Sequence, residues 1–141
     1  MLNSNYDHNP DILSCLSNLS NDEVFTPPEL ANQLLDLLPE DIWTTKKAKI
    51  LDPACKSGIF LRESAKRFEI GLKELIPDQQ ERLNHILEKQ LYGYSITKLT
   101  SMLSRRTLYC SKQANGKYSI CNAFDNSQGN ISFERIEHTW L

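Results

Sequence analysis

The chain has 141 residues, of which 40% are hydrophobic and 24% are charged, which suits one folded domain and excludes a disordered chain. No apolar run approaches the ~20 residues that a membrane span needs, and the N-terminus lacks the basic start of a secretory signal, so we expect a cytoplasmic protein without a membrane partner. The net charge of −2 argues against a nucleic-acid coat protein.

The first predicted helix follows a weakly patterned lead-in. Residues 1–20 are rich in Asn and Ser and form this lead-in. Thr26 is a suitable helix N-cap, Pro27 fits the first helical position, and Glu29 closes a capping box. Pro39 is expected to end the helix. Its leucines recur at helical spacing: Leu30, Leu34, Leu35, Leu37 and Leu38.

A short strand over 48–51 comes next, and Asp52-Pro53 must leave it. Ser57-Gly58 then opens a helix whose expected inward residues are Ile59, Phe60, Ala65, Phe68 and Leu72. Pro77-Asp78 starts another helix, with Leu83, Ile86 and Leu87 on one face.

A second strand is expected over 91–96, and Thr97 caps a further helix that carries Leu99, Met102, Leu103 and Leu108. The order is thus helix, strand, helix, helix, strand, helix. This order predicts an α/β fold, the start of a Rossmann-like, doubly wound parallel sheet.

Residues 110–141 are short, polar and punctuated by glycine. With strand-like stretches at 118–121 and 131–135, they predict a small β hairpin or subdomain rather than the next α/β unit. Charge is also uneven: residues 1–45 hold eight acids and no Lys or Arg, whereas residues 89–124 hold six basic residues and no acid. This basic region is either a phosphate-facing patch or a solvated face.

The loop between the first strand and its helix is the sharpest feature. It reads Ile50-Leu51-Asp52-Pro53-Ala54-Cys55-Lys56-Ser57-Gly58-Ile59-Phe60-Leu61. Ligands bind at the carboxyl ends of strands in open α/β sheets, and free N–H groups at a helix start favour anionic groups. Spacing alone nevertheless favours an ordinary strand–helix turn.

This segment resembles the D-P-A-C-G-S-G-x-F cofactor loop of adenine-N6 DNA methyltransferases of restriction–modification type. A Phe-Thr-Pro before a helix, as at 25–27, and a Gly-x-Glu-Ile or Gly-x-Asp-Ile strand end, as at 93–96, are also similar to that family. The resemblance covers about residues 20–108 and implies a truncated class I methyltransferase fold with S-adenosylmethionine as cofactor. The implied cofactor-binding residues are Phe25, Thr26, Pro27, Asp52, Pro53, Ala54, Lys56, Gly58 and Ser95.

The chain departs from the family pattern at three places. Lys56 replaces the first loop glycine, where positive φ would cost about 1 kcal/mol, although a lysine can instead contact the cofactor carboxylate. Ser95 replaces the acid that accepts the ribose hydroxyls, which predicts weaker binding. The catalytic Asp/Asn/Ser-Pro-Pro-Tyr/Phe is absent, because Pro27-Pro28 is followed by Glu29.

No catalytic residue is therefore assigned, and two hypotheses stand. The chain is the cofactor-binding fragment of a DNA methyltransferase, completed by a C-terminal half or a second subunit, with DNA as the partner of the complete enzyme. Alternatively, it is a degenerate methyltransferase-like module that binds DNA or a partner without chemistry.

The C-terminal segment also offers candidate metal ligands. Cys110, Cys121 and His138 form half of a zinc ribbon if a longer chain supplies the fourth ligand that a closed site needs. The alternative, which we favour for this chain, is two small core thiols and a surface histidine.

Overall fold

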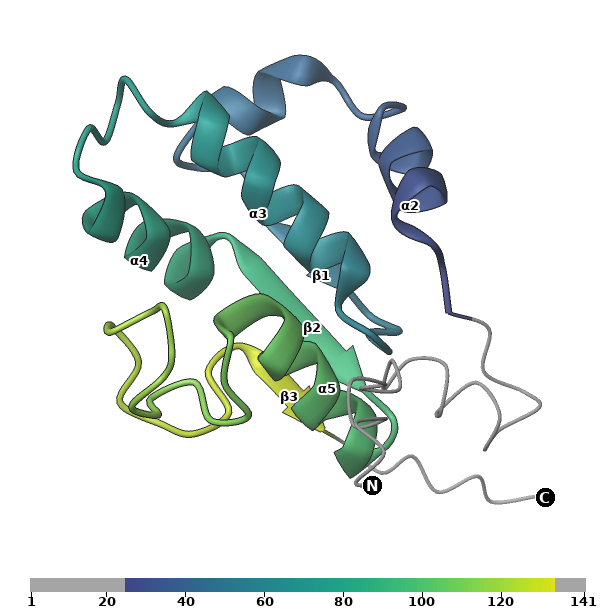
Figure 1. The fold of residues 1–141 in the computed structure, drawn as a ribbon. Coiled ribbons are helices and arrows are strands. Elements are labelled where there is room, and N and C mark those ends of the chain that lie inside the picture. The colour runs from purple at the N-terminus through teal and green to yellow at the C-terminus, as the bar shows by residue number, and fades with distance from the viewer. Residues whose placement is uncertain (1–24, 134–141) are drawn as a thin grey trace, which may run out of the picture.

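A computed structural model describes residues 25–133 (Figure 1). The expected lead-in at 1–20 lies outside the described residues, as does His138. The elements alternate between helices and strands, which confirms the α/β class. In chain order they are α2 (Pro28–Leu35), the 3-10 helix η1 (Glu40–Thr44), β1 (Ile50–Asp52), α3 (Ile59–Gly71), α4 (Gln79–Lys89), β2 (Leu91–Ser95), α5 (Lys98–Tyr109) and β3 (Ile131–Phe133).

The three strands form one parallel sheet in the order β1-β2-β3. Ile50 is paired with Leu91, and Gly93 with Ile131. Parallel neighbours require crossovers, which α3 and α4 supply between β1 and β2, and α5 between β2 and β3. All three strands therefore point their carboxyl ends to one edge of the sheet, the edge at which such folds bind ligands.

The core lies between the sheet and α3. Figure 1 shows α3 and α5 crossing over the strands, with α2 beside α3. Leu61 and Phe68 of α3 and Leu91 of β2 are fully buried. Trp43 of η1 meets the Phe68 ring edge-on, with the ring centroids 5.1 Å apart. This stack closes the end of the core that faces η1.

The other face of the sheet is open in the part of the chain that the structure describes. Leu51 of β1 is 54% exposed and Tyr94 of β2 is 46% exposed. Residues 25–133 thus supply one helical layer, and the second layer of a doubly wound sheet is not formed by them.

Two helix boundaries differ from the sequence prediction. Helix α2 begins at Pro28 with Pro27 as its N-cap, and no side chain among the described residues caps it, so the capping box of Thr26 and Glu29 is not formed. Pro27 already holds the extended backbone that an N-cap needs, with φ −68° and ψ 153°. The helix also ends at Leu35 rather than at Pro39, which is instead the N-cap of η1.

The prediction of a hairpin over 110–141 is wrong for residues 110–133, the part of this range that the structure describes. Residues 118–121 form no strand, and Ile131–Phe133 pairs in parallel with β2 as the third strand of the main sheet. Cys110 ends α5 in the left-handed conformation, with φ 62°. The backbone then loops back, held by a bond from the Ala114 N–H to the Ser127 carbonyl, to place β3 beside β2.

Helix α5 buries a polar face. Its N-cap is Thr97, as predicted, and the Thr97 hydroxyl accepts a bond from the Thr100 N–H. Leu99 is 54% exposed, whereas Ser101 and Ser104 are almost fully buried. The buried serines allow the helix to approach the loop after β1 closely.

Candidate functional site

The loop that joins β1 to α3 is anchored to the end of β2. The Cys55 N–H donates to the Tyr94 carbonyl at 2.8 Å, and the Ser95 hydroxyl donates to the Cys55 carbonyl at 2.7 Å. Ser95 is 3% exposed. Its side chain is therefore committed to holding the loop at the carboxyl edge of the sheet.

A second anchor comes from α5. The Cys55 thiol donates to the Ser104 oxygen at 2.8 Å, and the Ser104 hydroxyl donates to the Lys56 carbonyl at 3.0 Å. Burial raises the pKa of the Cys55 thiol to about 11, so it stays protonated at neutral pH and acts as a donor. Cys55 is thus a packed structural thiol rather than a nucleophile.

Gly58 is the glycine that this loop requires. Its φ is +78°, and a Cβ built there would lie 3.0 Å from the Cα and the carbonyl oxygen of Ser104. Among the described non-glycine residues, only Cys110 has a positive φ. The strain expected at Lys56 is therefore absent, because its backbone is one that any L-residue can adopt.

A cavity of about 240 Å³ opens where the loop meets the start of α3. Thr26, Asp52, Ala54, Lys56 and Gly58, all predicted from the sequence, line it. Phe25, Pro27, Pro53 and Ser95 are not among the lining residues. Sequence reasoning did not select Ser57, Ile59 and Phe60, although all three lie within the motif that marked the loop.

The residues that line this cavity carry both signs of charge. Asp52 accepts a bond from the Ala54 N–H at 3.1 Å, and burial raises the pKa of its carboxyl. Opposite charge comes from Lys56 and from the N-terminus of α3, whose first turn contains no acid. A carboxylate in the same cavity as helix N-terminal N–H groups and an ammonium group complements a zwitterionic amino-acid moiety.

The candidate zinc ligands do not form a cluster in the described part of the chain. Cys110 is exposed and Cys121 is buried, and burial raises the pKa of the Cys121 thiol, which disfavours the thiolate that zinc binds. Within residues 25–133, no group of three His, Cys, Asp or Glu side chains lies close enough to hold a metal. Zinc binding in a longer chain stays a prediction.

Comparison with known proteins gives a family over most of the sequence. Residues 14–134 match the family described as N-6 DNA methylase. The chain is 41% identical over 140 residues to a protein named uncharacterized adenine-specific methylase from Mycoplasma pneumoniae (strain ATCC 29342 / M129 / Subtype 1). That alignment covers 91% of this chain and 33% of the relative, so the chain spans about a third of the relative's length. No solved structure matches.

These findings extend the resemblance that the motifs indicated. The family match runs beyond residue 108 and includes β3, in agreement with its place in the main sheet. Among the described residues, no helix is long and apolar enough to cross a membrane.

Proposed function

The chain belongs to the N-6 DNA methylase family, and from this we propose that it carries the S-adenosylmethionine-binding part of an adenine-N6 DNA methyltransferase. The observation that carries the proposal is the cavity at the carboxyl end of β1, lined by eight residues of the cofactor motif and its upstream segment. Calorimetric titration with S-adenosylhomocysteine tests it.

The charges around the cavity fit the methionine end of this cofactor. Asp52 would hold the ammonium group, while Lys56 and the first N–H groups of α3 would hold the carboxylate. The bonds from Ser95 and Ser104 to the loop fix the shape of this site before the ligand arrives. When bound, the cofactor supplies the methyl group that such enzymes transfer to the adenine amino nitrogen.

The residues in this chain bind and orient but do not complete the reaction. The motif that grips the amino group of the flipped base is absent from the 141 residues. We therefore propose that methyl transfer to DNA requires a catalytic segment from a longer chain or a second subunit. A restriction–modification system is the proposed setting, because the loop is similar to that of its large methylases.

A degenerate, non-catalytic module is the second candidate. The observation that favours it is Ser95, whose hydroxyl is bonded to the Cys55 carbonyl and supplies no acid for the ribose. Lys56 gives the degenerate module less support than the sequence suggested, because the backbone strain expected at this residue is absent. The two candidates differ in cofactor binding, which the degenerate module would lack.

A further inference from the structure

Within residues 25–133 two arginines are buried, and their surroundings differ. Arg82 is 4% exposed and forms a two-pronged ion pair with Glu69, at 2.6 Å from Nε and 2.7 Å from Nη2. Arg105 is 8% exposed, and no carboxylate among residues 25–133 lies within 4.0 Å of it. A buried guanidinium without a counter-charge is costly, because it has lost most of its hydration.

Backbone carbonyls hold Arg105 in place. Its Nε donates to the Lys112 carbonyl at 2.7 Å, and its Nη1 donates to the Ile131 carbonyl at 3.1 Å. These bonds connect α5, the loop after it and the first residue of β3. They fix the direction of the guanidinium but bring no negative charge, and Nη2 has no hydrogen-bond partner among the described residues.

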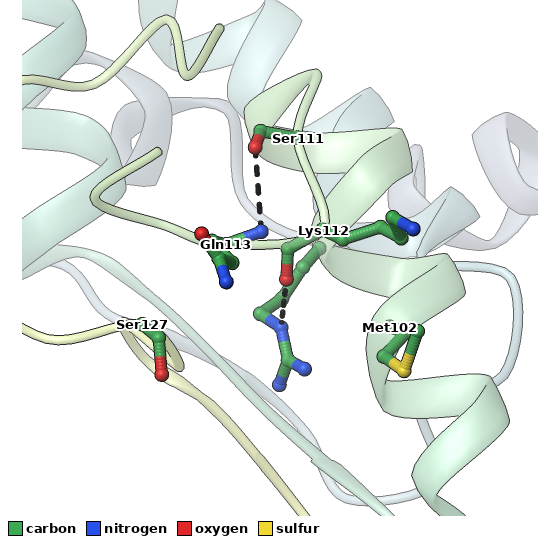
Figure 2. Close-up of a pocket in the computed structure, with 6 residues that line it drawn as sticks. Met102, Ser111, Lys112, Gln113 and Ser127 are labelled. Atoms are coloured by element: carbon green, nitrogen blue, oxygen red, sulfur yellow. Dashed lines mark hydrogen bonds between the residues drawn. The ribbon is translucent and has the colours of Figure 1, made fainter. Parts of the chain in front are cut away.

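A cavity of about 320 Å³ lies beside this guanidinium (Figure 2). Its described lining contains no acid and consists of Met102, Arg105, Ser111, Lys112, Gln113 and Ser127. The Ser111 oxygen accepts a bond from the Gln113 N–H at 3.3 Å, so its hydroxyl hydrogen is available to donate. The lining thus combines a fixed cation with neutral donors, which is the chemistry that recognises a tetrahedral oxyanion.

We propose that this cavity binds a phosphate group, held by the Arg105 guanidinium and by the side chains of Ser111, Gln113 and Ser127. The group belongs either to a nucleic-acid backbone or to a small phosphorylated molecule. Five of the six lining residues lie in the basic segment at 89–124, which contains no acid, so the local charge favours an anion. Because Arg105 contacts the amino end of β3, the site is separate from the cofactor cavity and does not rest on cofactor binding.

The proposal is tested by adding inorganic phosphate at constant ionic strength while recording amide resonances of the chain. Saturable shifts at residues 111–113 and at Ser127 are expected. Ser127→Glu puts a carboxylate beside the guanidinium and should weaken phosphate binding at least about tenfold. Ala123→Glu changes the net charge equally on an exposed residue outside the cavity, and affinity should stay within about twofold.

A second variant covers the case in which Ser127→Glu fails to fold. Ser127→Ala removes one neutral donor and should weaken binding about threefold. Competition then identifies the source: displacement by a short DNA duplex assigns a nucleic-acid backbone, and displacement by glycerol 3-phosphate alone assigns a small phosphorylated molecule. Absence of saturable shifts at millimolar phosphate, or equal weakening by Ser127→Glu and Ala123→Glu, would overturn the proposal.

Discussion

Ser104 donates its hydroxyl hydrogen to the carbonyl oxygen of Lys56 at 3.0 Å and thereby ties α5 to the loop that lines the cofactor cavity. The same hydroxyl oxygen accepts the Cys55 thiol at 2.8 Å. A residue 48 positions away along the chain thus holds two consecutive loop residues. The loop conformation therefore depends on the packing of α5, and not on the loop sequence alone.

Replacing Ser104 by alanine should weaken this anchor. Two hydrogen bonds are lost and two buried groups are left unpaired, so we expect the free energy of unfolding to fall by about 1–3 kcal/mol in urea denaturation. Ser101→Ala is the matched control, because Ser101 is also buried in α5 but its hydroxyl bonds only to the Lys98 carbonyl within that helix. Equal losses in the two variants would refute a specific role for Ser104.

Substitutions at the two glycine positions of the family loop should both reduce stability, but for different reasons. Gly58→Ala places a Cβ at positive φ and 3.0 Å from Ser104, which we expect to cost at least about 2 kcal/mol of stability. Lys56→Gly restores the family residue where φ is not positive, so it should cost about 0.5–1 kcal/mol through backbone entropy. An increase in thermal stability in Lys56→Gly would contradict this account of the loop.

The thiol of Cys55 should react slowly. Its pKa is raised to about 11 by burial, whereas Cys110 is exposed. At pH 8, peptide mapping after iodoacetamide treatment should show early alkylation of Cys110 and late alkylation of Cys55. Alkylation of Cys55 as fast as that of Cys110 would show that the thiol is not buried as described.

The raised pKa of the Cys55 thiol makes the free energy of unfolding depend on pH in the alkaline range. The unfolded thiol, with a pKa near the ordinary value of 9.0, loses its proton before the folded one does. This contribution to the free energy of unfolding is therefore complete below pH 9.0 and is lost as the pH rises toward about 11. In denaturant titrations, the free energy of unfolding of the Cys55→Ser variant should fall less steeply over this pH interval than that of the unchanged protein. An equal fall in both proteins would argue against a raised pKa of the Cys55 thiol.

The chain alone should not methylate DNA. It lacks the motif that holds the target amino group, so radiolabelled methyl from S-adenosylmethionine should not enter unmethylated DNA above a protein-free blank. Label incorporated by the purified chain would contradict the proposal that catalysis needs another segment.

Local signals in the sequence predicted much of the cofactor side of the fold. Asp52-Pro53 marked the end of β1, Thr97 marked the start of α5, and the motif located the loop, because each of these signals depends on neighbouring residues. The strand character of 131–135 was predicted, but the place of β3 beside β2 was missed, because pairing with a distant strand leaves no local signal in the sequence. The burial of Ser104 in α5 was not predicted, because it accompanies a hydrogen bond to a distant loop, which hydrophobic spacing does not report.

Calorimetric titration of the folded chain with S-adenosylhomocysteine tests the central proposal most directly. We expect weak saturable binding, reduced about tenfold in Asp52→Asn and unchanged in Asp41→Asn, whose carboxylate is exposed outside the cavity. Affinity should also fall as the pH drops through the raised pKa of Asp52, because the protonated carboxyl no longer attracts the ligand ammonium. No heat at millimolar ligand, or equal losses in the two variants, would contradict a cofactor site at this loop.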